Sequence, residues 1–329
     1  MTRHLTVAVG AYDRTLPLMA GLVRIADADA HFVTAPLEEI FARAFDDRAY
    51  DVTELSASNY IYLTATGNCP YVALPIYPSR AFRHSAVYIR TDRGIEGPRD
   101  LAGRLVGVRE YSMTAALVAR GVLDDEYGLA SRDVRWRYGP ADVKDTQPIV
   151  RVHPRGVELE PLGAPGNLSD ALAEGAIDAM VAYKPPACFV KGHPKVRRLF
   201  EDYRAAEQDY GRRVGGIPIM HFIGVRREIA EREPALCLAI CRAFEAARGY
   251  AAERLSEIQA PFTLLPWGAD ELSQVNAALG DGYWRYGVPG NEAALANLCR
   301  YSHQQGLAPR ELAIDELFAP ATLDWRPSP

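Results

Sequence analysis

The stretch RLVGVREYSMTAALVARGVLDDEYG, residues 104–128, passes from a short apolar run into a helical pattern. The run at 105–108 is typical of a buried strand, and residues 113–127 repeat apolar side chains at helical spacing until Gly128, a common helix terminator. A strand followed by a polar loop and a helix is the repeating unit of α/β proteins. The stretch therefore predicts an α/β fold with a polar loop at the carboxyl end of a strand.

The same alternation continues on both sides of this stretch. Expected strands include residues 4–10, 31–36, 51–56, 71–78, 86–91, 134–139 and 217–225. Expected helices include residues 15–26, 37–47, 233–255, 268–279 and 291–306, with Thr15 as a cap. The order predicts largely parallel sheets in a discontinuous lobe, residues 1–86 plus 202–329, and in an inserted lobe, residues 87–201. Ligands of open α/β sheets bind at the carboxyl ends of strands, so we expect a ligand cleft between the lobes.

Composition excludes several classes of protein. The 329 residues are 48% hydrophobic, which predicts packed globular domains. A formal net charge of −5 without a basic tail argues against nucleic-acid binding, and no apolar run is long enough for a membrane span. The start MTRHLTVAVG has no signal-peptide pattern, and the five cysteines form no CxxC pair. We therefore expect reduced, partly buried thiols in a cytoplasmic protein.

Motifs of common cofactor sites are absent from the sequence. There is no HxH, HxxxH or HExxH pattern, no GxSxG elbow, no GxGxxG turn and no P-loop. We expect no cofactor, while a divalent metal bound by His84 and His221 stays open as an alternative.

The stretch PIYPSRAFRHS, residues 75–85, holds the densest cluster of functional groups. Arginine suits bidentate recognition of carboxylates, and histidine titrates near neutral pH. In an extended chain Arg80 and His84 would face one side, and Arg83 and Ser85 the other, unless the chain turns at Pro78. A surface loop with salt bridges is the alternative interpretation.

Three helix-opening loops are further candidates for anion binding, because backbone N–H groups at a helix start are unpaired. Their polar candidates are Tyr12, Asp13, Arg14, Ser56, Ser58, Asn59, Ser112, Met113 and Thr114. For each loop the alternative is a solvated turn or a helix cap, and Ser112 in particular is expected to cap its own helix.

Two isolated residues complete the set. His221 lies in IPIMHFIGV, an apolar strand, where it is either a core histidine or a catalytic one. Lys184 ends a predicted strand before two prolines and is either a binding residue or a surface lysine.

Several of these segments, DVTELSASNY, PIYPSRAFRHSAVYI, YKPPACF and the stretch from residue 200 to 228 among them, resemble the 4,5-dihydroxyphthalate decarboxylase family. The resemblance runs from about Leu5 to Arg248. It implies a two-lobed fold similar to that of type II periplasmic solute-binding proteins. The family motif matches at residues 79–85, at Met113 and Thr114, and at His221. Ser112 and Lys184 depart from the residues expected there, a longer polar side chain and arginine, which bears on substrate identity more than on reaction class.

The resemblance implies a carboxy-lyase that protonates a ring carbon of a hydroxylated aromatic acid and releases CO2, as in phthalate catabolism. His84 is favoured as the proton donor, with His221 as its partner. An arginine should hold the carboxylate that stays, because binding the leaving one would stabilise the ground state. The alternative is a solute-binding protein for a small organic anion. The C-terminal helices either pack on their own lobe or form a homo-oligomer contact, and the sequence leaves this open.

Overall fold

The computed structural model describes residues 3–142, 150, 152–163, 166–259 and 261–327. The chain folds into two compact units. Unit 1 comprises Met1–Ala81, Gly211–Ala296 and Leu312–Pro329, and unit 2 comprises Phe82–Tyr210 and Asn297–Glu311. The lobe boundaries expected from the sequence, 86/87 and 201/202, and a ligand cleft between the lobes stay predictions.

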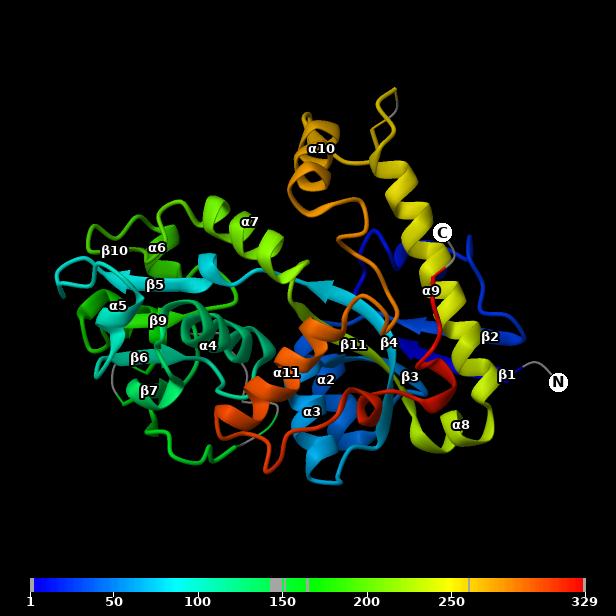
Figure 1. Cartoon of the computed structure of the whole chain (residues 1–329), viewed down its shortest axis with the longest axis horizontal. Helices are drawn as coiled ribbons and strands as arrows, with labels where there is room; N and C mark the ends of the chain where they lie inside the picture. The colour runs from blue at the N-terminus through cyan, green and yellow to red at the C-terminus, as the bar shows by residue number, and fades with distance from the viewer. Residues whose placement is uncertain (1–2, 143–149, 151, 164–165, 260, 328–329) are drawn as a thin grey trace. The chain divides into compact units, whose positions relative to one another are not determined.

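Unit 1 is built on a five-stranded sheet of order β2-β1-β3-β11-β4 (Figure 1). Its strands are β1 (Arg3–Ala8), β2 (Ala28–Val33), β3 (Val52–Ser56), β4 (Tyr71–Arg80) and β11 (Ile219–Arg226). β1 is parallel to β2 and to β3, whereas β11 is antiparallel to both β3 and β4. The sheet is therefore mixed, whereas the sequence analysis expected a largely parallel sheet. The sequence pattern does not reveal the direction in which β11 inserts.

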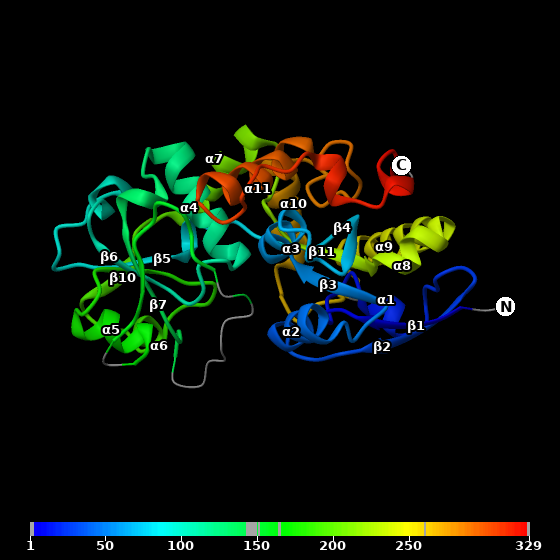
Figure 2. The same ribbon diagram turned by 90° about the horizontal axis from the view of Figure 1, so that it is seen from below.

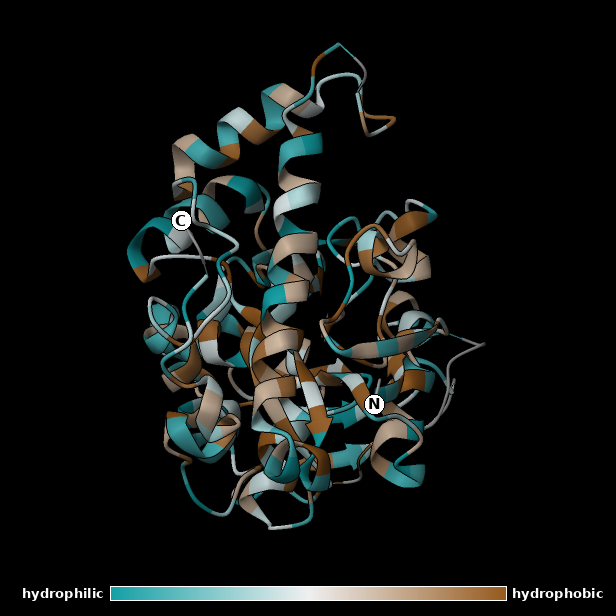
Figure 3. Cartoon of the chain, turned by 90° about the vertical axis from the view of Figure 1, so that its right-hand side faces the viewer, coloured by the Kyte–Doolittle hydropathy of each residue, from teal (hydrophilic) through white to brown (hydrophobic). Residues whose placement is uncertain are grey.

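The helices of unit 1 are mostly those that the sequence predicts. They are α1 (Leu16–Met19), α2 (Leu37–Asp47), α3 (Ala57–Ala65), α8 (Arg227–Arg232), α9 (Pro234–Leu255) and α10 (Gly268–Leu279). The long helix in Figure 3 is α9, whose lower half is mainly hydrophobic and whose buried residues include Cys237, Ile240 and Phe244. Two more helices, α7 (Tyr203–Val214) and α11 (Glu292–Gln304), contain residues of both units. Among the described helices none is long and apolar enough to cross a membrane.

Unit 2 has a six-stranded sheet of order β10-β5-β9-β6-β7-β8. Its strands are β5 (Val87–Arg90), β6 (Leu105–Val108), β7 (Arg135–Tyr138), β8 (Leu159–Pro161), β9 (Ala179–Val181) and β10 (Val196–Arg198). β9, β6, β7 and β8 run parallel, whereas β5 is antiparallel to β9 and β10. Figure 2 shows α4 (Thr114–Tyr127) on one face of this sheet, and α5 (Leu168–Glu174) and α6 (Ala187–Val190) on the other.

The strand, loop and helix predicted over residues 104–128 are confirmed as β6 and α4, and Gly128 ends α4 with a left-handed φ of 68°. The predicted cap is wrong. Met113 occupies the N-cap position, and the Ser112 hydroxyl donates to Glu110 (2.8 Å) and to the Val150 carbonyl (3.1 Å). Because the helix begins at Thr114, Ser112 lies one residue before the N-cap position, and its hydroxyl instead binds the buried Glu110 carboxylate.

The helix expected over residues 15–26 is much shorter than predicted. Only Leu16–Met19 are helical, because Gly21 adopts a φ of 70° and turns the chain. Thr15 stands at the N-cap position without capping, since its hydroxyl oxygen accepts from the Tyr12 amide at 2.8 Å and its hydrogen goes to the Gly10 carbonyl at 2.6 Å. The hydrogen bond to Gly10 joins the two ends of the loop after β1. The loop contains the candidate site residues Tyr12, Asp13 and Arg14.

All five cysteines, Cys69, Cys188, Cys237, Cys241 and Cys299, are free and buried. Burial raises the pKa of the Cys237 thiol to about 11 and that of Cys241 well above its ordinary value. The prediction of reduced, partly buried thiols agrees with this arrangement.

Close packing of α4 rests on one glycine. A Cβ at Gly121 would lie 2.4 Å from the Tyr301 ring, and that ring is 3% exposed and held by a hydrogen bond of 2.6 Å to Asp125. Because the ring is buried and its hydroxyl is held by Asp125, it has little freedom to move away from an added methyl group.

We predict that Gly121→Ala lowers the free energy of unfolding by about 1–3 kcal/mol through overpacking, although alanine favours a helix. Gly249→Ala in α9 is the matched control, because no atom lies within 4 Å of its added Cβ. The control should raise stability by about 0.5–1 kcal/mol. Urea unfolding of both variants measures the effects, and changes of the same sign would contradict the packing argument.

Candidate functional site

A buried carboxylate lies at the centre of the unit 1 site. Glu54 is a residue of β3, and its side chain is fully buried. Its oxygens accept hydrogen bonds from the Gly10 amide (2.8 Å), the Tyr12 hydroxyl (2.9 Å) and Nδ1 of His221 (2.6 Å). A buried charge is tolerated only when such partners replace water, so these contacts explain why Glu54 can occupy this position.

His221 is held in one orientation by Glu54. It lies on β11 opposite Ser56 of β3 and Ser79 of β4, and its side chain is 16% exposed. Its ring meets Phe41 edge-on at 5.0 Å between centroids. An ionised carboxylate only accepts, so with Glu54 ionised this contact assigns the hydrogen to Nδ1 and leaves Nε2 as the nitrogen that can exchange a proton with a ligand.

Tyr12 supports the same carboxylate. Burial, and then the negative charge of Glu54, raises the pKa of Tyr12 far above its ordinary value, so the hydroxyl stays protonated and donates. The Arg14 guanidinium stacks on the Tyr12 ring at 4.2 Å and on Trp284 at 4.5 Å, and its Nε donates to the Pro78 carbonyl at 2.6 Å. Asp13 accepts from Arg14 at 2.9 Å. The structure thus brings the loop after β1 together with His221.

Ser56, Ser58 and Asn59 lie at the start of α3 in the same unit. Ser56 takes the N-cap position without a side-chain cap, and all three residues are at most 4% exposed. Ser56 lies opposite His221 in the pairing of β3 with β11, so this loop is next to Glu54 and His221. Their role in binding stays a prediction.

Arg80 ends β4 and is buried, with 8% of its surface exposed. Its guanidinium donates to the carbonyls of Ile217 (2.9 Å) and Arg285 (2.8 Å) and to the side-chain oxygen of Asn291 (2.6 Å). Burial lowers the pKa of Arg80 to about 10. These contacts give Arg80 a structural role in unit 1, and a role in ligand binding stays a prediction.

Residues 80–85 are not extended, and the chain does not turn at Pro78, which lies within β4. The strand stops at Arg80, the chain enters unit 2 at Phe82, and His84–Ala86 form a short 3-10 helix. His84 is 2% exposed, and its ring centroid lies 5.1 Å from that of Phe200 and 5.4 Å from that of Tyr210.

The neighbours of His84 in the motif lie in unit 2 as well. Burial lowers the pKa of Arg83 to about 10, against the opposing effect of Glu207, and the Ser85 amide donates to Glu207 at 2.9 Å. The binding role predicted for both residues stays a prediction.

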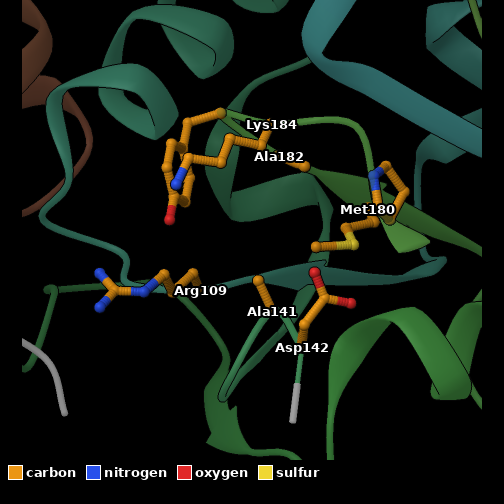
Figure 4. Close-up of a pocket in the computed structure, with 8 residues that line it drawn as sticks. Arg109, Ala141, Asp142, Met180, Ala182 and Lys184 are labelled. Atoms are coloured by element: carbon orange, nitrogen blue, oxygen red, sulfur yellow. The ribbon is translucent and has the colours of Figure 1, made fainter. Parts of the chain in front are cut away.

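Unit 2 contains a pocket of about 180 Å³ (Figure 4). Its lining residues are Arg109, Ala141, Asp142, Met180, Ala182, Tyr183, Lys184 and Pro186. Lys184, which the sequence singled out, has its ammonium 5.0 Å from the Tyr183 ring centroid. Of the predicted loop that follows Arg109, Ser112 and Thr114 are buried and Met113 is partly buried.

Sequence reasoning missed Glu54, Arg109 and Asp142. The sequence did hint at Glu54, because this carboxylate lies within an expected strand. All five residues of that strand, VTELS, are buried in the structure. Arg109 follows directly on the apolar run of β6 and so also stood at a strand end. Asp142 lies in a segment whose sequence carries no strand or helix pattern.

In the part of the chain that the structure describes, no three histidine, cysteine, aspartate or glutamate residues gather in a way that could hold a metal ion. His84 and His221 belong to different units, so a shared metal site for them stays untested.

Comparison with curated proteins finds two close relatives. The chain is 42% identical over 322 residues to a 4,5-dihydroxyphthalate decarboxylase of Comamonas testosteroni, which covers 98% of each chain. It is 44% identical over 210 residues to a 4,5-dihydroxyphthalate decarboxylase of Pseudomonas putida, covering 64% of this chain and 81% of the relative. No family model matches the chain.

Solved structures share the fold at low sequence identity. The periplasmic aliphatic sulphonate binding protein SsuA of Escherichia coli matches with a TM-score of 0.56 and 14% identity, over 99% of this chain and 93% of that one. The desulfurization enzyme DSZB matches with a TM-score of 0.51 and 15% identity, over 98% of each chain. With its two mixed α/β sheets, the chain has the predicted periplasmic-binding-protein-like fold of two α/β lobes.

We predict that Arg80→Lys lowers the free energy of unfolding by about 2–4 kcal/mol, because lysine lacks the fork and leaves buried acceptors unsatisfied. The control is Arg285→Lys, whose exposed side chain donates to one carbonyl, that of Gly282. Chemical denaturation of both variants measures the difference. Equal free energies of unfolding for the two variants would show that the Arg80 hydrogen bonds do not stabilise the fold.

Proposed function

The chain belongs to the 4,5-dihydroxyphthalate decarboxylase family, and we propose that it is a carboxy-lyase that removes one carboxylate of a hydroxylated aromatic dicarboxylic acid as CO2. The solute-binding alternative is not favoured. The relatives named as decarboxylases are 42–44% identical to the chain, whereas the binding protein SsuA shares 14% identity and therefore only the fold.

The reaction sets a simple requirement. When the bond between the ring and a carboxylate breaks, its electron pair stays on the ring carbon, and a proton must take the place of CO2. In 4,5-dihydroxyphthalate each carboxylate has a hydroxyl group para to it on the ring. That hydroxyl donates electron density to the carbon, so the carbon can be protonated before CO2 leaves. The enzyme must therefore supply an acid at the ring carbon.

The observation that carries our assignment of this acid is the 2.6 Å contact between His221 and Glu54. Glu54 holds Nδ1–H, so an imidazolium at His221 presents Nε2–H as the proton to transfer. The sequence favoured His84 as the donor. His84 instead lies among the rings of Phe200, Tyr210 and Tyr127, and we assign it to the aromatic surroundings of unit 2.

Glu54 and Tyr12 act as positioning residues in this proposal. Glu54 fixes the ring and tautomer of His221, and the Tyr12 hydroxyl bonds the same carboxylate oxygen, Oε1. Tyr12 cannot serve as the acid at neutral pH, because its raised pKa makes proton release costly.

The activity test is incubation of the purified chain with 4,5-dihydroxyphthalate, with phthalate as the matched compound that lacks hydroxyl groups. We expect CO2 from the first and none from the second, because phthalate cannot push electrons to the ring carbon. If none of the hydroxylated aromatic acids tested releases CO2, the proposed function is refuted. Equal release from phthalate would refute the protonation mechanism.

Substitution at the paired residues tests the roles. We expect His221→Gln to lower kcat by about 10²–10⁴-fold and Glu54→Gln by about 10–100-fold, with substrate affinity nearly unchanged. His4→Gln, an exposed histidine of the same unit, is the control and should keep full activity. If His84→Gln removes turnover while His221→Gln keeps it, the donor is His84.

A further inference from the structure

The unit 2 pocket collects polar side chains from three neighbouring parallel strands. Arg109 follows β6, Asp142 comes shortly after β7, and Lys184 follows β9. These strands are adjacent in the order β9-β6-β7 and run in the same direction. Their carboxyl ends therefore meet at one edge of the sheet, which is where open α/β sheets bind ligands.

The size and walls of the pocket suit a single aromatic ring. A cavity of about 150 Å³ can hold one benzene molecule, and this pocket measures about 180 Å³. Met180 and Ala182, which are nearly fully buried, and Ala141 give it apolar wall area. An aromatic face can pack on such a wall, which leaves the polar side chains to select the substituents at the edge of the ring.

The polar groups are arranged with opposite charge at opposite sides. Figure 4 shows the Arg109 guanidinium on one side of the pocket and the Asp142 carboxylate on the other, with the Lys184 side chain above them and extending toward the Arg109 side. Arg109 is 4% exposed, so its charge acts with little screening by water. The buried Glu110 carboxylate lies 3.6 Å from the Arg109 guanidinium and offsets part of its charge, although Glu110 does not line the pocket.

We propose that this pocket holds the substrate ring with its carboxylate edge toward Arg109 and its hydroxyl edge toward Asp142. The inference rests on the proposed function, and it names the residue that binds the substituents at each edge of the ring. The Arg109 fork pairs with the carboxylate that is retained, and Lys184 adds positive charge beside it. Phenolic hydroxyl groups donate to the Asp142 carboxylate, which only accepts when ionised.

This polarity agrees with the chemistry of the reaction. The retained carboxylate keeps its charge throughout, so the Arg109 pair does not oppose the departure of CO2. A hydroxyl that donates to Asp142 gains electron density on its oxygen, which strengthens its push toward the ring carbon. 4,5-Dihydroxyphthalate carries both carboxylates on one edge of the ring and both hydroxyl groups on the opposite edge, as the pocket requires.

Crossed binding measurements test the proposal in the full-length chain. Phthalate, which has only carboxylates, is titrated by calorimetry, and catechol, which has only hydroxyl groups, by ligand-observed NMR. Arg109→Gln should weaken phthalate binding about 10–100-fold and leave catechol binding within about threefold. Asp142→Asn should show the reverse pattern. Arg135→Gln is the control, because Arg135 is an exposed residue of β7 that pairs with Glu158.

Thermal melts first establish that each variant is folded. If Arg109→Gln is unfolded, Arg109→Lys replaces it and should still weaken phthalate binding about tenfold, because lysine lacks the fork. Three results would overturn the proposal: no phthalate binding to the unchanged chain, equal loss of both ligands in the Arg109 variant, or the same loss in the Arg135 control. The crossed pattern without any CO2 release would count against the proposed function alone.

Discussion

The structure of unit 1 depends on a carboxylate enclosed within a sheet. Glu54 stands where a hydrophobic side chain would ordinarily pack, and it is stable there because three donors replace its water. Those donors come from the loop after β1 and from β11, so the charge links three strands that are far apart in sequence. A shift of β11 by one residue would turn His221 to the opposite face and leave Glu54 without that donor. The same contact thus determines strand register and histidine orientation.

Much of the fold could be predicted from local patterns, whereas the site depended on long-range contacts. The stretch from residue 104 to 128 contains its own strand, loop and terminating glycine, and the structure confirms each of them. His221 was recognised as a polar residue in an apolar strand, but its partner lies 167 positions away, and no local rule pairs them. Arg80 was grouped with His84 because they are close in sequence. The acceptors of Arg80 instead come from residues 217, 285 and 291, which only the folded chain brings together.

The fold by itself does not decide between binding and catalysis. A sulphonate-binding protein and a desulfurization enzyme both share it with this chain at similar, low identity. The groups proposed here to act in the reaction lie in different units. Unit 1 contributes an imidazole with one nitrogen committed to a carboxylate, and unit 2 contributes a pocket with separated positive and negative groups.

The burial of every cysteine has a practical consequence. The raised pKa values of Cys237 and Cys241 keep these thiols protonated at neutral pH, and a protonated, enclosed thiol reacts slowly with maleimides. Fluorophores would therefore react mainly with cysteines introduced on the surface, and the natural cysteines would be labelled little. The natural sequence is therefore a suitable background for attaching fluorophores at chosen surface positions of either unit.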